Sequence, residues 1–338
     1  MKKILAIIPD NVDGCVYHRI QVPLVNLKGF DLTQVNQLDG CSDATLMGFD
    51  LLWFNRLNGV ADVFGQVDRL KRLGLPYVVD FDDYWALPQE HILYKSYRDN
   101  DVTHKLVYLI KNAAHVIVTH EHLAAKTVPL NNNVTVVRNA IDPTQPQWET
   151  STKVTEGHTV FGWCGGESHR PDLELLKPTL KKLHEENKTN LMLGGYSDTS
   201  TWIEFATWFT NDKKYDKCLV KRGQDVYSYG QLYDYMTTCL IPLRDSTFNR
   251  CKSELKMLEA GFKKKAVIVS NVMPYTYLIT GSNCLAVNSD KHWYKLMKRI
   301  NDSKYLEQDL AGKLYEDVSV KYHINTQNLI REQIFRLI

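Results

Sequence analysis

The segment from residue 245 to residue 271 constrains the fold most, because it predicts a loop, a helix and a buried strand in succession. Its apolar side chains recur with the spacing of one helical face at Cys251, Leu255, Leu258 and Phe262. This spacing predicts a helix with one buried side. The apolar run Ala266–Val269 has no polar face, as expected of a strand covered on both sides in a parallel sheet.

A polar stripe lies beside this apolar face, at Lys252, Lys256, Glu259 and Lys263. Free backbone N–H groups at a helix start attract anions, and Lys252 and Lys256 add positive charge there. Asn249 or Ser253 is placed to cap the start. Glu259, two turns into the helix, is placed to accept hydrogen bonds from a ribose. The alternative is an ordinary surface helix with a solvated Lys/Glu face.

This segment resembles the donor-binding helix of GT-B glycosyltransferases, especially glycosyltransferase family four. The matching parts are Ile241-Pro242-Leu243, the 245–252 loop, Lys256–Gly261 and Val267–Ser270. Family members usually carry two glutamates eight positions apart. Glu259 matches the second, which in the family holds the ribose, whereas the first falls on Cys251, so the usual sugar-hydroxyl contact has no counterpart. The run Asn249–Ser253 looks like the shorter variant of phage-encoded members.

The chain begins with a predicted strand, Lys3–Pro9, followed by a loop and a helix that reaches Leu27. Gly14 in the loop is where the backbone can approach a ligand. His18 and Arg19 are expected in the first turn of the helix, at the carboxyl ends of the strands. A polar loop with a solvated arginine is the alternative. The Gly loop followed by Tyr-x-Arg-Ile resembles phage-type members of the family.

The buried strand that begins at Pro76 is followed by three carboxylates, those of Asp80, Asp82 and Asp83. In the family, a strand here ends with His or His-Asp facing the transferred sugar. By position, Asp82 replaces this His and Asp83 matches the Asp. A carboxylate at this place can hydrogen bond a sugar hydroxyl or stabilise positive charge at the anomeric carbon.

The same aspartates allow other interpretations. Asp-x-Asp after an apolar strand is the metal motif of GT-A glycosyltransferases, which have one nucleotide domain, yet this chain also has nucleotide-binding features after residue 160. Phosphatases with an aspartyl nucleophile carry Thr or a similar residue just after the motif, where Tyr84 stands here, and an acidic pair late in the chain, which this sequence lacks. A structural aspartate cluster that caps the next segment remains open.

The segment Asn139-Ala140-Ile141-Asp142 strongly resembles the Asn-Gly-Ile-Asp sequence that closes the first domain in the family, with Ala140 in place of Gly. The following stretch, from residue 143 to residue 157, is rich in Pro, Thr, Gln and Glu, which predicts a linker.

The second predicted domain opens with a strand that leads into Gly165 and Gly166 and then a helix from about residue 172 to residue 186. Two adjacent glycines let backbone N–H groups face a diphosphate. Ser168 and His169 lie at the entrance of the helix and complete a candidate anion site. Phage-type members show a comparable Gly-Trp-x-Gly, His and Asp-Leu pattern.

Further strands are predicted at 190–196, 219–222 and 239–243, and helices at 199–209, 228–238, 292–301 and from 304 onward. Arg222 ends one strand, where the family places phosphate- or base-contacting residues; a solvated basic turn is the alternative. One aromatic group has helical spacing and is expected in the core: Trp202, Phe205, Trp208 and Phe209. The tyrosines at 227, 229, 233 and 235 are expected to pack on a surface helix.

Composition narrows the class of protein. The chain has 338 residues, of which 44% are hydrophobic and 24% charged, a globular balance with room for two domains. No apolar run is long enough for a membrane span. Seven scattered cysteines without zinc spacing favour a reducing, cytoplasmic location over a disulfide framework. The formal net charge of +2 neither requires nor excludes a polyanionic partner.

The pattern of alternating strands and helices implies two doubly wound, Rossmann-like α/β domains. The resemblance implies a GT-B fold in which these domains face a cleft. Its expected parts are an acceptor-side domain at 1–145, a linker at 146–157, a donor-binding domain at 158–312 and a C-terminal helix at 313–338 that returns to the first domain.

The resemblance also implies transfer of a sugar from a nucleotide-sugar donor, with retention, to a hydroxyl acceptor. No cofactor or metal ion is expected, since Lys252, Lys256 and helix N-termini would neutralise the diphosphate. The phage-type segments suggest duplex DNA carrying hydroxymethylated pyrimidines as the acceptor, in a host cytoplasm. A polysaccharide or protein acceptor, or a non-catalytic module that binds sugar nucleotides or DNA, is the alternative.

Overall fold

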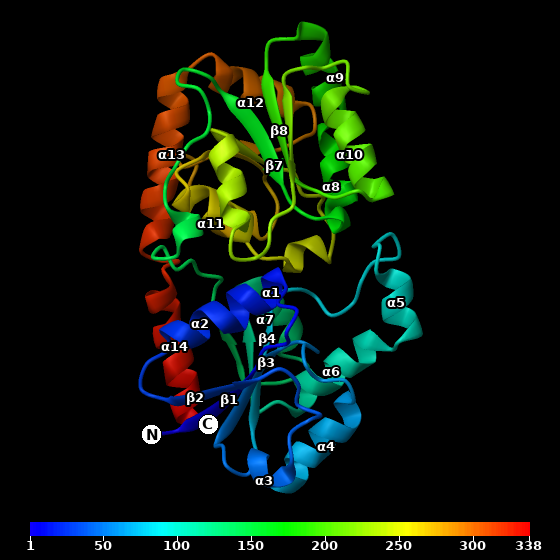
Figure 1. The fold of residues 1–338 in the computed structure, drawn as a ribbon, viewed down its shortest axis with the longest axis vertical. Coiled ribbons are helices and arrows are strands. Elements are labelled where there is room, and N and C mark those ends of the chain that lie inside the picture. Colours follow the sequence, from blue (N-terminus) through cyan, green and yellow to red (C-terminus); the bar gives the residue numbers. More distant parts are fainter. The chain divides into compact units, whose positions relative to one another are not determined.

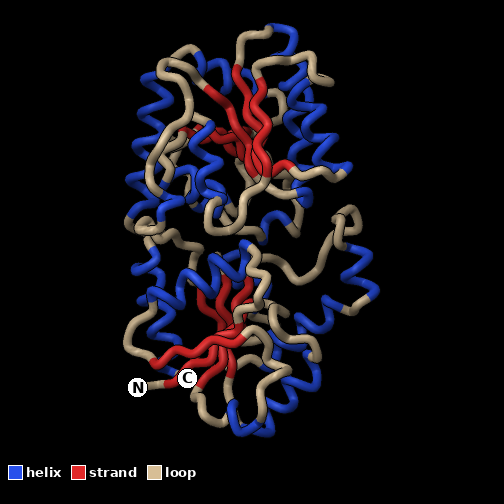
Figure 2. The backbone as a smooth tube through the Cα atoms, in the orientation of Figure 1, coloured by secondary structure: helices blue, strands red, loops and turns tan.

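The computed structural model describes residues 1–338, which form two compact units. The first unit comprises Met1–Ala140, Arg250–Ser253 and Tyr322–Ile338, and the second comprises Ile141–Asn249 and Glu254–Lys321. Each unit is built on one parallel six-stranded sheet with helices packed against it (Figure 1 and Figure 2). The predicted fold class, two doubly wound α/β halves, is confirmed.

The elements of the first unit alternate between strands and helices. They are β1 Lys3–Ile7, α1 Gly14–Val16, a π-helix Tyr17–Gln21, α2 Val22–Asn26, β2 Asp31–Val35, α3 Asp43–Leu46, β3 Leu51–Asn55, α4 Val63–Leu73, β4 Tyr77–Phe81, α5 Tyr94–Asp99, α6 Val102–Asn112, β5 His115–Val118, α7 Glu121–Thr127, β6 Val134–Val136 and α14 Ile324–Leu337. The helix expected up to Leu27 is thus three short helical pieces with a π-helical centre.

The first sheet has the order β2-β1-β3-β4-β5-β6, so the chain reverses direction across the sheet between β1 and β3. Alternate side chains of each strand enter opposite cores. Leu52 and Phe54 of β3 pack with α4 and α6, whereas Leu51 and Trp53 pack with α2 and α14. This two-sided burial explains why the central strands β1, β3, β4 and β5 are mostly apolar. Ligands of open α/β sheets bind outside the carboxyl ends of the strands at such a reversal.

The C-terminal helix α14 belongs to the first unit, where it lies beside α2 (Figure 1). Phe335 packs edge-on against Trp53, with ring centroids 5.1 Å apart, and Asn328 Nδ2 donates to the carbonyl oxygen of Pro23 at 2.9 Å. The return of the tail therefore begins at Tyr322, and the residues before it, back to residue 313, group with the second unit. The change of unit early in the chain falls after Ala140.

The second unit repeats the alternation. Its elements are a 3₁₀ helix Pro146–Trp148, β7 Val160–Cys164, a 3₁₀ helix Glu167–His169, α8 Arg170–Leu173, a 3₁₀ helix Glu174–Leu176, α9 Lys177–Glu186, β8 Asn190–Tyr196, α10 Ser200–Thr210, β9 Cys218–Arg222, a 3₁₀ helix Tyr229–Tyr235, β10 Thr238–Ile241, a 3₁₀ turn Asn249–Cys251, α11 Leu255–Phe262, β11 Ala266–Ser270, a 3₁₀ helix Tyr275–Tyr277, β12 Leu285–Val287, α12 His292–Asn301 and α13 Lys304–Ser319.

The second sheet has the order β12-β11-β10-β7-β8-β9, which places its reversal between β7 and β10. Trp202, Phe205 and Phe209 of α10 are buried against this sheet, as expected from their spacing. The helix predicted at 228–238 is instead a 3₁₀ helix followed by a strand. Tyr233 is fully buried, so the expectation of a surface tyrosine is wrong there. None of the helices combines the length and hydropathy needed to cross a bilayer.

Helix α11 corrects the prediction made for residues 251–263. It begins at Leu255, and Glu254 stands at its N-cap without a side-chain capping bond; neither Asn249 nor Ser253 caps it. Cys251 lies outside the helix and packs in the core of the first unit. The polar stripe is not a solvated face either, because Glu259 is only 3% exposed.

Candidate functional site

A glycine turn lies at the reversal of the second sheet, directly after β7. A Cβ on Gly165 would approach the Trp163 ring to 2.5 Å, so this position accepts only glycine. Gly195, at the end of β8, has a φ of +106°, and a Cβ there would come within 2.4 Å of the Gly165 carbonyl oxygen. Gly166, in contrast, has open space where a Cβ would stand. The turn therefore presents a backbone that a ligand can approach closely.

Lys256, in the first turn of α11, places its ammonium beside this turn. Its Nζ donates to the carbonyl oxygen of Cys164 at 2.7 Å and lies 5.6 Å from the centroid of the Trp163 ring. The Cβ position of Gly165 is 3.1 Å from the same nitrogen. An ammonium has three donors, and the bond to Cys164 occupies one. The strand end, the glycine turn and a positive charge thus meet at one point.

Glu259 lies one turn after Lys256 and is buried. Its Oε2 accepts a hydrogen bond from Tyr233 Oη at 2.6 Å. Burial raises the pKa of Glu259 to about 7, although the Lys256 charge and the Tyr233 hydrogen bond both oppose this shift. The carboxyl group is therefore oriented, and near neutral pH it is poised between its two protonation states.

His169 and Asn249 are joined through a buried carboxylate. Asp172 Oδ2 lies 2.9 Å from His169 Nδ1, and Oδ1 accepts from Asn249 Nδ2 and from the backbone N–H of Arg244, both at 2.9 Å. This network ties the segment after the glycine turn to the loop after β10. Ser168 is half-buried, next to His169. Four of the predicted donor-side residues therefore gather with the two glycines: Ser168, His169, Asn249 and Lys256.

Arg222 does not join this group. It ends β9, the edge strand two positions from β7, and its guanidinium forms an exposed ion pair with Asp198 at 3.0 Å. An exposed pair of this kind contributes little to stability. The structure thus supports the alternative interpretation of Arg222, in which it belongs to a solvated basic turn.

In the first unit, Arg19 is an interior residue rather than a group at the open sheet edge. Its Nε and NH2 donate to the two carboxylate oxygens of Asp80 at 2.7 and 3.2 Å, NH1 donates to Asn139 Oδ1 at 2.9 Å, and NH2 donates to the Val137 carbonyl at 2.8 Å. Arg19 and Asp80 are both fully buried. The pair joins the π-helix to β4 and to the segment after β6, which is a positioning role.

Asp82, just after β4, is the carboxylate that stays ionised. Burial by itself raises the pKa of Asp82, but the Arg56 guanidinium, a hydrogen bond from Cys15 and the charge of Arg19 together bring it below its usual value. Asp83 beside it behaves oppositely: burial and the Asp82 charge raise its pKa, against the charges of Lys252 and Arg56. Asp83 is thus the stronger base of the pair, and Asp82 is the stronger acid.

Arg56 was not among the predicted catalytic or donor-binding residues; the sequence suggested it only as part of a basic patch for a DNA acceptor. It directly follows β3 at the reversal of the first sheet, and its φ of 50° is uncommon for a residue with a side chain. Its NH2 donates to Tyr97 Oη of α5. The parallel pairing of β3 with β4 places Arg56 next to Asp82, and the only signal in the sequence was a charged residue at the end of an apolar strand.

Gly14 and His18 lie close in the chain to Cys15, whose side chain hydrogen bonds Asp82. His18 is 6% exposed, and burial, with the nearby Arg19 charge, lowers the pKa of His18 to about 4 despite a hydrogen bond to the Ala140 backbone. His18 is therefore neutral at physiological pH. Gly14 begins α1, exposed and with open space around its Cβ position, so a ligand can approach its backbone.

The sequence predicted one helix that includes Lys252, Ser253 and Lys256. In the structure, Lys252 and Ser253 belong to the short segment Arg250–Ser253 of the first unit, whereas Lys256 lies on α11 of the second unit. Ser253 Oγ accepts from Asn139 Nδ2 at 2.7 Å, and the Lys252 charge acts on Asp83; all four residues belong to the first unit. His120, which caps α7 through Nδ1, hydrogen bonds the backbone of Cys251 and Lys252. Lys252 therefore lies near Asp83, and Ser253 is linked through Asn139 to Arg19.

Asp80 in β4 and the two aspartates that follow this strand do not form a metal centre with other side chains. No group of three or more His, Cys, Asp or Glu side chains is arranged to hold a metal ion, and Asp80 is engaged by Arg19. All seven cysteines are free thiols.

Solved structures share this fold at low sequence identity. Sucrose-phosphate synthase from Thermosynechococcus elongatus has a TM-score of 0.74 at 13% identity, over 100% of this chain and 99% of that chain. HepE from Anabaena, in complex with UDP-glucose, has a TM-score of 0.72 at 12% identity, and OtsA has 0.66 at 10% identity, each over 100% of both chains. No profile of a known protein family and no curated protein matches the sequence. The chain therefore has the two-sheet GT-B fold of these proteins.

Proposed function

We propose that this chain is a glycosyltransferase that takes a sugar from a nucleotide-sugar donor and transfers it, with retention, to a hydroxyl acceptor. The observation that carries the proposal is the Lys256 ammonium held beside the Gly165–Gly166 turn, at the reversal of the second sheet. A cation and an uncovered backbone at this place suit a diphosphate. HepE, with the same fold, was solved with UDP-glucose.

On the donor side, the glycine turn, the Ser168 hydroxyl and Lys256 would hold the diphosphate. As the glycosidic bond breaks, negative charge develops on the leaving phosphate, and a fixed ammonium stabilises that charge more than it stabilises the intact donor. We propose that Lys256 performs this role without a divalent metal. Glu259, oriented by Tyr233, would accept hydrogen bonds from the ribose.

In the first unit, Asp82 is the group suited to the reacting sugar. It keeps its negative charge, so it would hydrogen bond a sugar hydroxyl or stabilise positive charge at the anomeric carbon. Arg56 and Cys15 hold this charge in place, while Arg19 and Asp80 fix the backbone around it. Retention predicts that the product has the same anomeric configuration as the donor, which the coupling constant of the anomeric proton measures.

For the acceptor, we propose a hydroxymethylated pyrimidine in duplex DNA, which would have to be flipped out of the stack to react. The support is the likeness of the Asn249–Ser253 segment to phage-type enzymes. A glycan hydroxyl is the second candidate, and charge pairing favours it: on α4, Arg69 pairs with Asp43 at 2.6 Å and Lys71 lies 3.8 Å from Asp68. These pairs reduce the positive charge that a duplex would need.

The experiment incubates the protein with a panel of sugar nucleotides and with hydroxymethylated duplexes, unmodified duplexes or glycans. Mass analysis of nucleosides and glycans then identifies the product. A DNA acceptor predicts a sugar adduct on the hydroxymethylated base and an activity that falls steeply with salt. Transfer to a glycan alone would contradict the proposal of a DNA acceptor, but it would support the proposed glycosyltransferase activity.

A further inference from the structure

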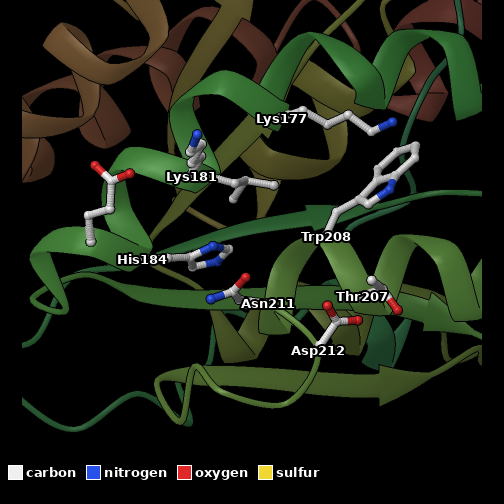
Figure 3. A pocket seen from close by; sticks show the side chains of 9 residues that line it. Lys177, Lys181, His184, Thr207, Trp208, Asn211 and Asp212 are labelled. Atoms are coloured by element: carbon white, nitrogen blue, oxygen red, sulfur yellow. The ribbon is translucent and has the colours of Figure 1, made fainter.

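A polar groove lies between α9 and α10 of the second unit, apart from the glycine turn and Lys256. Its volume is about 430 Å³, within the range of about 300–1,000 Å³ typical of ligand sites. Side chains of both helices project into it (Figure 3): Lys177, Lys181 and His184 from α9, and Trp208, Asn211 and Asp212 from the end of α10 and the turn after it. None of these residues has a part in the proposed reaction.

The turn that closes the groove has an unusual backbone. Asn211, Asp212 and Lys213 follow one another with φ angles of 47°, 53° and 66°, in the left-handed region that side chains rarely adopt. Such conformations gather at ligand-binding sites, where the surrounding structure maintains them. Here the run presents the Asn211 amide and the Asp212 carboxylate to the space between the helices (Figure 3).

The groove offers fixed donors and acceptors beside ring surfaces. His184 Nε2 donates to the Phe209 carbonyl at 3.0 Å, which assigns the proton to Nε2 and makes Nδ1 an acceptor. Trp208 contributes an indole N–H, and the ammonium of Lys177 lies 3.7 Å from the centroid of its ring. Leu180 is the aliphatic residue of the lining.

The charges of the groove balance. The lining holds two lysines, Lys177 and Lys181, and two carboxylates, Glu185 on the same helix and Asp212 in the turn after α10, so a polyanion such as nucleic acid gains no net attraction. A balanced set of donors and acceptors next to aromatic rings suits a ligand with many hydroxyl groups and no charge, because each hydroxyl both donates and accepts.

We infer that this groove binds a neutral oligosaccharide. The sugar hydroxyls bond the Asn211 amide, the Asp212 and Glu185 carboxylates and Lys181. The C–H face of a sugar ring lies against His184 and the edge of the Trp208 ring, because Lys177 lies over the face of that ring. The site holds a carbohydrate chain away from the glycine turn, and its occupancy does not depend on nucleotide-sugar turnover. Binding and catalysis are therefore measured separately.

The test titrates the full-length protein with neutral gluco-, xylo- and manno-oligosaccharides and follows binding by saturation-transfer NMR and calorimetry. Asn211→Gly keeps the left-handed backbone and removes the amide, and Trp208→Leu removes the ring. Ile203→Ser, on an exposed part of α10 outside the groove, is the matched control. At least one oligosaccharide is expected to bind with a Kd that rises about tenfold in each groove variant, the loss expected of one hydrogen bond or ring contact, and is unchanged in the control.

Two outcomes would overturn the inference. One is that none of the oligosaccharides binds, or that the two groove variants bind as tightly as the control. The other is that a duplex or single-stranded DNA binds and that Trp208→Leu and Asn211→Gly abolish this binding. Circular dichroism and thermal melting of each variant separate loss of the site from loss of the fold.

Discussion

The ammonium of Lys256 lies 2.7 Å from the carbonyl oxygen of Cys164, the last residue of β7. This bond joins the first turn of α11 to the strand end that leads into Gly165 and Gly166. It anchors a positive charge at the reversal of the second sheet while leaving two of the three ammonium donors for a ligand. The donor-site predictions below follow from this contact.

Lys256→Ala is expected to weaken nucleoside diphosphate binding about 10- to 100-fold, because a hydrogen bond to a charged group contributes about 1.5–3 kcal/mol. Isothermal titration calorimetry measures this change. Lys298→Ala, which removes an exposed lysine of α12, is the control for the lost charge. Equal affinities of both variants and the unmodified protein would remove Lys256 from the donor site.

Glu259 is expected to make the stability of the protein depend on pH. Its pKa is raised from 4.5 to about 7 in the folded state, so the folded protein binds more protons than the unfolded chain between these values. The free energy of unfolding is therefore expected to fall by about 3 kcal/mol in total as the pH rises from about 4.5 to about 7, because the folded state is stabilised by the protonated form of Glu259. Urea unfolding at pH 5 and pH 8 should show this loss, and Glu259→Gln should reduce it. The same pH dependence in both proteins would contradict the assignment.

Asp82→Asn is expected to lower turnover about 100-fold or more, while nucleoside diphosphate affinity stays within about twofold. The amide keeps the shape of the side chain but lacks the negative charge that would stabilise the transition state. Steady-state kinetics and calorimetry on the same preparation separate the two effects. Asp99→Asn, at an exposed site on α5, is the control. A parallel loss of affinity and turnover would instead indicate a structural role for Asp82.

Asp80→Asn is expected to destabilise the protein by about 3–5 kcal/mol, because it leaves the guanidinium of Arg19 buried without its counter-charge. Removing the exposed partner of Arg98 by Asp99→Asn should cost less than about 1 kcal/mol. Chemical denaturation of both variants gives the comparison. Similar small effects would show that the buried pair is dispensable.

The alternation of strands and helices could be predicted from the sequence because apolar runs and helical spacing are local properties. The glycine turn and Lys256 also followed from local patterns. The helix start near Cys251 could not be located in this way. In the sequence Cys251 has the spacing of the apolar residues of α11, yet it lies in the 3₁₀ turn Asn249–Cys251 and its side chain packs in the core of the first unit.

The remaining site residues depend on contacts between distant parts of the chain. Arg56 and Tyr97 are 41 positions apart, and only the strand order brings Arg56 to Asp82. A charged side chain such as Arg19 is expected at the surface, but Arg19 is buried. Its partners Asp80 and Asn139 come from segments far along the chain. Tyr233, predicted to pack on a surface helix, and Glu259, predicted to face a ribose, are buried together and joined by a hydrogen bond across 26 positions. Spacing within one segment carries no information on such pairs.

The most direct test of the central claim is the release of free nucleoside diphosphate from a panel of sugar nucleotides, measured for the unmodified protein and for Lys256→Ala. The account predicts that one sugar nucleotide is turned over to its nucleoside diphosphate, that an acceptor accelerates this release, and that Lys256→Ala slows it by at least about tenfold, in line with a lost charge-assisted hydrogen bond. If every sugar nucleotide remains intact with each DNA and glycan acceptor, or if Lys256→Ala releases product as fast as the unmodified protein, the proposed glycosyltransferase mechanism is wrong.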